Sequence, residues 1–332
     1  MAEEVADAKA SLSLSFSGSG FLMLYQVGAV QALQDLAPEI LRSASRVYGA
    51  SAGSLIATAV VCECNLDEVQ AAIIDAAKEA RECLFGPLFH VPRMVQAMVS
   101  RLLPTNAHQL ASGRLHIGLT RLSDGENVMV SDYRSNEELT QALVCSCFVP
   151  FYCGIIPPSF RGVRYIDGGL TNMQPLFGLK SMITISPYTG EHDICPRDCP
   201  VSHFCFQIFN TSFQLSIENF CRLAYSLFPP PSVVMQEFHS QGYRDCVHYL
   251  HSNTINVCER QKKSGLMGTL VEVISQRLLS NTLQLKTSSR LQPKEMCSVC
   301  IALSQSQLEK KMVAALVAGK GSVSFFYFCG VY

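Results

Sequence analysis

A serine flanked by glycines, in Gly49-Ala50-Ser51-Ala52-Gly53, is the strongest candidate for chemistry in this sequence. The pentapeptide follows a short β-rich run and precedes an apolar helical stretch, the setting in which a sharp strand–turn–helix junction exposes a nucleophilic serine. Gly49 and Gly53 would allow such a turn to form. Because N–H groups at a helix N-terminus favour negative charge, the N–H of Ala52 is a natural donor to the oxyanion of acyl transfer. The alternative is a glycine-rich turn in which Ser51 only caps the helix.

A second glycine turn, Gly18-Ser19-Gly20, lies one strand–helix unit upstream. Two parallel strands joined by a right-handed crossover would bring both turns to the same carboxyl edge of a sheet. We therefore expect the backbone N–H groups of Gly18, Ser19 and Gly20 to complete an oxyanion hole with Ala52. A dinucleotide-binding turn is excluded, because the third glycine of that motif would fall at Met23. A purely structural turn stays open as an alternative.

An aspartate at the end of a predicted strand is the candidate general base. It stands in Tyr165-Ile166-Asp167-Gly168-Gly169, where Gly168 and Gly169 would leave room for its approach to the serine hydroxyl. A carboxylate is a weak base at neutral pH, so burial should raise the pKa of Asp167 toward the working range. The alternative is an aspartate that simply begins a turn.

A histidine-assisted triad is the competing arrangement for the serine. Of the eight histidines, His192 in a polar loop beside Asp193 fits best, and His116 lies in an alternating strand. Neither stands in a glycine-flanked loop comparable with those around Ser51 and Asp167. Activity that survives separate replacement of the two histidines would count against a triad.

The elements that must position these residues alternate between strands and helices. Short apolar runs predict strands, apolar residues at helical spacing predict helices, and Asp124-Gly125 predicts a hairpin turn. This alternation predicts a three-layer α/β/α fold with a mostly parallel central sheet. The predicted strands cover residues 12–16, 46–48, 115–119, 128–130, 165–166, 182–186 and 204–209, and the predicted helices cover residues 25–36, 54–62, 66–80, 91–102, 137–144 and 266–279.

The chain divides into three parts by motif content and periodicity. Residues 1–11 form an N-terminal segment, residues 12–250 contain the motifs described above, and residues 251–332 form a C-terminal tail. The tail has scattered Ser, Gln and Lys, weak periodicity and an aromatic end at Phe325-Phe326-Tyr327-Phe328. We expect catalysis to reside in residues 12–250.

The composition bounds the class of protein. Hydrophobic residues make up 48% of the 332 residues and charged residues 16%, with a net charge of −1, so no nucleic-acid partner is expected. The acidic start Met1-Ala2-Glu3-Glu4 lacks the positive region of a signal peptide, and no apolar run reaches the roughly 18 residues of a membrane-spanning helix. We therefore expect a cytoplasmic protein whose fifteen cysteines are reduced thiols.

Two cysteine pairs invite comparison with a zinc site. Cys297 and Cys300 are three positions apart, and Cys195 and Cys199 are four apart. A structural zinc site needs a second pair at matched spacing, and no Cys or His pair beside either one supplies it. We expect neither a metal nor a cofactor.

Taken together, the motifs resemble those of the patatin-like phospholipase family, whose members use a Ser-Asp dyad without histidine. The resemblance covers residues 12–250. It extends to the vertebrate branch that includes adipose triglyceride lipase, and within that branch it is most similar to a skin-expressed acylceramide transacylase. The matching motifs are residues 16–22, 49–53 and 167–169 for the family, residues 147–152, 185–187 and 227–230 for the branch, and residues 145–148 and 193–200 for the skin-expressed member.

The resemblance implies a lipid acyl hydrolase or transacylase in which Asp167 activates Ser51. It implies triacylglycerol as acyl donor, ω-hydroxyceramide or water as acceptor, and a lipid-droplet or membrane surface as the place of action. An α/β-hydrolase-type coactivator protein is a further implied partner. The skin-expressed member has a long proline-rich extension that this chain lacks, and the resemblance fades from about Thr254. The alternative is a non-catalytic lipid-binding or scaffold protein on the same fold.

Overall fold

The computed structural model of this chain describes residues 12–82, 91–176, 181–198 and 204–264. All of them belong to one compact unit, Met1–Leu278. Side chains are described up to residue 253.

Four parallel strands form the centre of the main sheet, in the order β3-β2-β1-β7. Their alternating or continuous apolar residues are buried, because helices cover the sheet. The mostly parallel sheet and the α/β class agree with the sequence prediction. The four strands are β1 (Ser13–Phe16), β2 (Arg46–Ala50), β3 (Leu115–Arg121) and β7 (Met182–Ile185).

Antiparallel strands extend the sheet beyond β3. The predicted hairpin forms, with β4 (Asn127–Val130) antiparallel to β3, and β6 (Val163–Asp167) pairs antiparallel with β3 and with β5 (Ser159–Phe160). The strand predicted over residues 204–209 also forms, but as a separate two-stranded sheet. In that sheet β8 (Cys205–Ile208) pairs with β9 (Thr211–Gln214).

The helices follow the apolar periodicity of the sequence. Helix α3 packs on β1, β2 and β3, and α7 packs on β3 and β6. The described helices are α1 (Met23–Leu36), α2 (Pro38–Ser43), α3 (Ala52–Val61), α4 (Leu66–Glu82), α5 (Val91–Leu102), α6 (Ala107–Ala111), α7 (Asn136–Ser146), α8 (Ile217–Leu227) and α9 (Ser232–Ser264), with short 3₁₀ turns η1 (Gly20–Leu22) and η2 (Gly168–Leu170).

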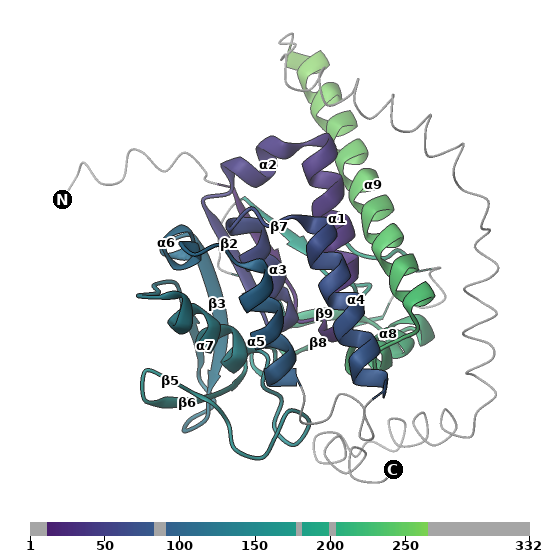
Figure 1. Cartoon of the computed structure of the whole chain (residues 1–332). Helices are drawn as coiled ribbons and strands as arrows, with labels where there is room; N and C mark the ends of the chain where they lie inside the picture. Colours follow the sequence, from purple (N-terminus) through teal and green to yellow (C-terminus); the bar gives the residue numbers. More distant parts are fainter. Residues whose placement is uncertain (1–11, 83–90, 177–180, 199–203, 265–332) are drawn as a thin grey trace. The chain divides into compact units, whose positions relative to one another are not determined.

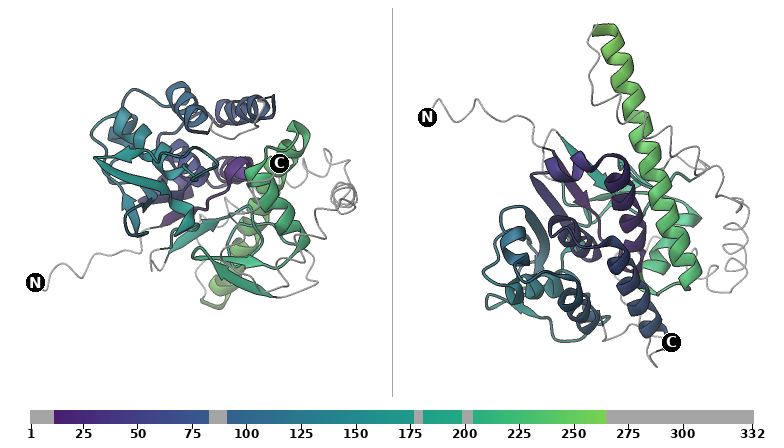
Figure 2. Two further views of the ribbon diagram at one scale, coloured as in Figure 1. Left: turned by 90° about the horizontal axis from the view of Figure 1, so that it is seen from below. Right: turned by 45° about the horizontal axis from the view of Figure 1, so that its top comes forward.

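The long helix α9 lies along α1 (Figure 1), and its C-terminal end extends past the sheet (Figure 2). The two helices approach closely at glycines: a Cβ on Gly28 would lie 1.9 Å from the carbonyl oxygen of His239, and one on Gly242 would lie 1.9 Å from that of Tyr25. The Tyr25 hydroxyl also donates a 2.7 Å hydrogen bond to Asp245. These contacts hold α9 on the domain.

Helix α9 crosses residue 250, where the sequence suggested that the catalytic domain ends. The predicted helix over residues 266–279 lies outside the described residues. The division into domain and tail therefore stays a prediction. No helix within the described ranges combines the length and the apolar character needed to span a bilayer.

Candidate active site

Ser51 occupies a strained turn between β2 and α3. Its backbone has φ 51° and ψ −133°, a conformation that costs a non-glycine residue about 1–3 kcal/mol. The turn is so tight that a Cβ on Gly53 would lie 2.3 Å from the carbonyl oxygen of Ser17. Gly49 packs in turn against the backbone of Gly53. Glycine at these positions lets the start of α3 press against the end of β1, and the turn presents the Ser51 side chain at the carboxyl edge of the sheet.

Strand pairing places Asp167 beside Ser51 at the carboxyl edge of the sheet. Ala50 pairs with Gly118 across β2 and β3, and the next β3 residue, Leu119, pairs with Asp167 at the end of β6. The Ser51 hydroxyl donates a 2.6 Å hydrogen bond to Oδ2 of Asp167, although the two residues are 116 positions apart. The structure thus brings together the two side chains that the sequence suggested as nucleophile and base.

Neighbouring residues hold both the carboxylate and the backbone of Asp167 in place. Its Oδ1 accepts a 2.7 Å hydrogen bond from the N–H of Gly169, and its backbone carbonyl accepts one from the Thr120 hydroxyl at 2.8 Å. Gly168 lies against the Gly118 backbone, where a Cβ would come within 2.0 Å of the carbonyl oxygen. The two glycines after Asp167 therefore permit the close packing that aims the carboxylate at Ser51.

Burial sets the proton affinity of Asp167, which is 4% exposed. Burial raises the pKa of its carboxyl group to about 7, and the hydrogen bonds from Ser51 and Gly169 oppose that rise. A carboxylate with a pKa near neutrality is much better matched to taking a serine proton than an ordinary aspartate with a pKa of 3.8.

The glycine turn after β1 lies beside Ser51, as parallel pairing of β1 and β2 predicted. A Cβ on Gly18 would lie 3.5 Å from the Ser51 Cβ. The expected donor role of Gly18 is wrong for this conformation, because its N–H already donates a 2.8 Å hydrogen bond to the Met173 carbonyl. Gly18 instead provides space next to the nucleophile.

The remaining expected oxyanion donors are Ser19, Gly20 and Ala52. Within the described part of the chain, no acceptor pairs with their backbone N–H groups. Gly20 has φ +51°, and a Cβ there would lie 2.0 Å from the carbonyl oxygen of Ser226 in α8, so only glycine fits. Ala52 is the first residue of α3, where the N–H groups have no helical acceptor.

The two histidines considered for a triad have other partners. His116 Nδ1 lies 3.2 Å from the Arg114 carbonyl, and its ring packs on Tyr48 with centroids 4.6 Å apart. Nε2 of His192 lies 3.1 Å from the carbonyl oxygen of Ser212. Burial lowers the pKa of both imidazoles. In the structure Asp167, rather than either of them, is the partner of the Ser51 hydroxyl.

Two buried polar residues around the site were not identified from the sequence. Gln26 on α1 donates from Nε2 to the Ser17 carbonyl at 2.9 Å and accepts at Oε1 from the Ser19 hydroxyl at 3.2 Å, so it holds the glycine turn. Ser146 at the end of α7 accepts a 2.9 Å hydrogen bond from the N–H of Ser51. Gln26 is one of three glutamines in α1, and its place among the apolar residues at the start of that helix was the available signal. Ser146 was visible only as part of a family motif.

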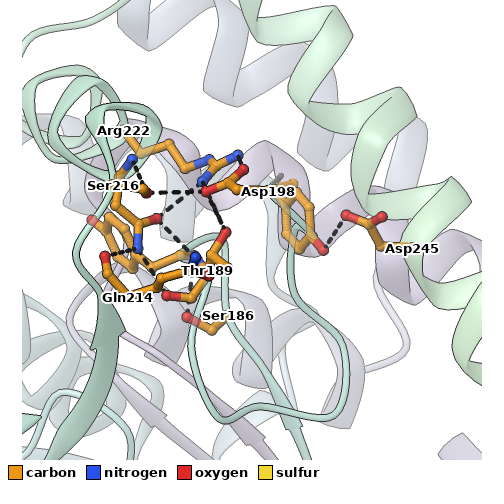
Figure 3. Close-up of polar contacts among 10 residues, drawn as sticks. Ser186, Thr189, Asp198, Gln214, Ser216, Arg222 and Asp245 are labelled. Atoms are coloured by element: carbon orange, nitrogen blue, oxygen red, sulfur yellow. Dashed lines mark hydrogen bonds and ion pairs between the residues drawn. The ribbon is translucent and has the colours of Figure 1, made fainter. Parts of the chain in front are cut away.

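A buried ion pair braces the neighbouring helix α8 (Figure 3). Arg222 donates from Nη2 to Oδ1 and from Nη1 to Oδ2 of Asp198, each at 2.7 Å, and Thr189 and Ser216 donate to the same carboxylate. Burial alone would raise the pKa of Asp198, but the hydrogen bonds and charge of Arg222 lower it below its ordinary value. Because Ser226 in α8 packs on Gly20, this pair supports the glycine turn from outside.

The two cysteine pairs considered for zinc fall largely outside the described part of the chain. Cys195 is buried, whereas Cys199, Cys297 and Cys300 lie outside the described residues. In the ranges that are described, no three His, Cys, Asp or Glu side chains are grouped so that they could hold a metal ion.

Comparison with known proteins agrees with this geometry. Human omega-hydroxyceramide transacylase is 51% identical over 241 residues, covering 72% of this chain and 45% of the relative. Human patatin-like phospholipase domain-containing protein 2 is 47% identical over 244 residues, covering 73% and 48%. Human 1-acylglycerol-3-phosphate O-acyltransferase PNPLA3 is 42% identical over 257 residues, covering 76% and 53%. The chain thus spans about half the length of these curated relatives.

The profile of the family described as patatin-like phospholipase matches residues 14–179. That segment includes the turn at Ser51, the glycine turn after β1 and Asp167, all at the carboxyl edge of one sheet. On this match and these relatives, the chain belongs to the patatin-like phospholipase family.

Proposed function

We propose that this chain is a serine acyl hydrolase or transacylase that acts on lipid esters through a Ser51–Asp167 dyad. The observation that carries the proposal is the 2.6 Å hydrogen bond from the Ser51 hydroxyl to a buried carboxylate. The pKa of that carboxylate, about 7, suits it to accept the serine proton. The alternative of a non-catalytic lipid-binding or scaffold protein gives no reason for a strained serine aimed at a buried base.

The reaction proceeds through an acyl-enzyme. Asp167 takes the Ser51 proton while Oγ attacks the ester carbonyl, and the N–H groups of Ser19, Gly20 and Ala52 receive the resulting oxyanion. Collapse of the tetrahedral intermediate breaks the ester bond, and protonated Asp167 gives its proton to the leaving alcohol. Water or a lipid alcohol then attacks the acyl-enzyme and loses its proton to Asp167. Collapse of this second tetrahedral intermediate breaks the bond between Ser51 and the acyl group, and Asp167 returns the proton to Oγ of Ser51.

The relatives suggest the substrate class. Their names refer to a ceramide transacylase and a 1-acylglycerol-3-phosphate acyltransferase, so lipid acyl groups and lipid alcohols are common to them. For this chain we propose triacylglycerol as acyl donor and ω-hydroxyceramide or water as acceptor. The choice of acceptor depends on how well the acyl-enzyme is shielded from water.

Exposed apolar side chains near the dyad support action at a lipid surface. The loop after α7 exposes Phe151, Ile155 and Ile156, and its Tyr152 hydroxyl donates to the Leu227 carbonyl at the end of α8. Exposed Phe209, in the β8–β9 turn, accepts at its carbonyl a 2.7 Å hydrogen bond from the N–H of Met173, next to the glycine turn. Contiguous exposed apolar surface marks membrane or protein interaction sites. We propose peripheral attachment to lipid droplets or membranes in the cytoplasm, with an α/β-hydrolase-type coactivator as a further partner.

Labelling with a fluorophosphonate probe tests the nucleophile. Wild-type protein should react, and Ser51→Ala should not, with circular dichroism confirming that both are folded. Equal absence of labelling in two folded proteins would refute the enzyme proposal. Lipid binding without acyl transfer, in the presence of detergent, would then favour the non-catalytic alternative.

Incubation with triolein and ω-hydroxyceramide together, followed by mass spectrometry, separates the two acyl acceptors. Free fatty acid alone would identify a lipase. Acylceramide would identify a transacylase, and its formation should be lost in Ser51→Ala.

A further inference from the structure

The backbone of Ser51 is held on both sides by serine hydroxyls. On one side, the Ser146 hydroxyl accepts the Ser51 N–H at 2.9 Å and donates to the Gly118 carbonyl at 2.8 Å. On the other side, the Ser54 hydroxyl donates to the Ser51 carbonyl at 2.6 Å. The nucleophile is thus tied both to β3 and to the first turn of its own helix.

This support is needed where the backbone turns out of β2. At φ 51° and ψ −133° the backbone of Ser51 no longer follows the strand. Its N–H therefore donates to the Ser146 hydroxyl and not to the carbonyl of a neighbouring strand. Strained conformations persist only when surrounding contacts determine them. The Ser54 contact is local, whereas the Ser146 contact comes from 95 residues away and links the turn to the rest of the site.

The same end of α7 also holds the second member of the dyad. Two residues after Ser146, the carbonyl of Phe148 accepts a 2.8 Å hydrogen bond from the backbone N–H of Asp167. One short segment therefore contacts Ser51 through a side chain and Asp167 through its backbone. A shift of this segment would change the distance between the Ser51 hydroxyl and the carboxylate.

Ser146 itself is not placed to touch a substrate. It is fully buried, and its hydroxyl already accepts one hydrogen bond and donates another. Its hydrogen-bonding capacity is directed to the protein backbone, which makes it a positioning residue rather than a catalytic one.

We propose that Ser146 is a positioning residue that fixes the strained Ser51 backbone and thereby sets the alignment of the Ser51 hydroxyl with Asp167. This inference rests on the proposed acyl-transfer function. In this proposal, the C-terminal end of α7 fixes the position of Ser51 relative to Asp167.

The test is the kinetics of Ser146→Ala on a soluble short-chain ester. Because small misplacements of reacting groups cost up to about 100-fold in rate, we expect kcat to fall by roughly 10- to 100-fold. KM should stay within about twofold, since the Ser146 side chain is fully buried and its hydroxyl bonds only to protein backbone. The pH of half-maximal kcat/KM should not move, since Asp167 keeps its burial and its bonds to Ser51 and Gly169.

Ser112→Ala is the matched control. The Ser112 hydroxyl likewise bridges backbone groups, donating to the His108 carbonyl at 2.8 Å and accepting from the Tyr133 N–H at 3.0 Å, but it precedes β3 at the opposite end from the dyad. The Ser112→Ala variant should lose thermal stability while keeping the wild-type kcat. If Ser146→Ala does not fold, the same kinetic measurements are made on Ser146→Cys. The cysteine thiol is similar in volume to the serine hydroxyl but forms only weak hydrogen bonds.

The outcomes separate this inference from the proposed function. Wild-type protein that fails to react with a fluorophosphonate refutes the function itself. If wild-type protein reacts and the folded Ser146 variant has a kcat within twofold of wild type, only the role of Ser146 is refuted. A kcat loss of equal size in Ser112→Ala would also refute that role, since it would show a general effect of stability.

Discussion

Oγ of Ser51 lies 2.6 Å from Oδ2 of Asp167, and burial holds the pKa of that carboxyl group at about 7. Only the ionised carboxylate can accept the serine proton. We expect kcat/KM to be low at pH 5 and to rise to a plateau above a midpoint near pH 7. Initial rates on a soluble short-chain ester from pH 5 to 9 measure this midpoint. A midpoint near pH 4 would mean that an ordinary, solvated aspartate or a different base is at work.

Replacement of Asp167 by Asn should separate catalysis from stability. We expect Asp167→Asn to lose about 100-fold or more in kcat, which is the usual contribution of general base catalysis. Fluorophosphonate labelling should slow in parallel, and an unchanged circular dichroism spectrum would show that the fold is retained. Near-normal activity in this variant would remove Asp167 from the mechanism.

The same substitution should make the fold more stable at high pH. The folded-state pKa of Asp167 lies above the ordinary 3.8, so its stabilising contribution is complete below about pH 4 and is lost as pH rises through about 7. Asn does not ionise, so the advantage of Asp167→Asn over wild type should grow between pH 5 and 8, on the order of 2 kcal/mol. Urea unfolding at both pH values measures it. If the difference in unfolding free energy between Asp167→Asn and wild type were the same at both pH values, burial would not raise the pKa of Asp167.

The buried pair of Arg222 and Asp198 should contribute strongly to stability. Arg222→Met leaves a buried carboxylate without its cation, a change that costs about 3–5 kcal/mol. The matched control is Arg244→Met, because Arg244 pairs with Glu237 at a similar 2.6 Å but on the surface, where such pairs contribute about 1 kcal/mol or less. Urea unfolding free energies compare the two, and equal losses would contradict the assigned role of burial.

Replacement of the two candidate triad histidines should leave acyl transfer nearly intact. His192→Gln and His116→Gln remove imidazoles whose partners are the carbonyls of Ser212 and Arg114. We expect kcat within about threefold of wild type for each folded variant. A loss comparable with that of Asp167→Asn in either variant would restore a histidine to the mechanism.

Much of the fold was predictable because its signals are local. The strand, tight turn and helix around Ser51 follow from two glycines and a change in apolar periodicity, and Asp124-Gly125 predicted the hairpin of β3 and β4. The strand over residues 204–209 was also visible, but its pairing was not. Pairing depends on which backbone groups meet in space, and apolar periodicity does not specify that.

The sequence by itself determined the chemical groups of this protein: a serine on a glycine turn, an aspartate at a strand end and a second glycine turn that must share its sheet edge. Only the tertiary structure decided how they meet. Antiparallel pairing of β6 with β3 brings Asp167 to Ser51, the Met173 carbonyl occupies the N–H of Gly18, and Ser146 reaches the nucleophile from α7. The physical reason is range: turn and helix preferences act within a few residues, whereas strand register, burial and hydrogen bonds across 95 to 116 positions arise only when the whole chain packs.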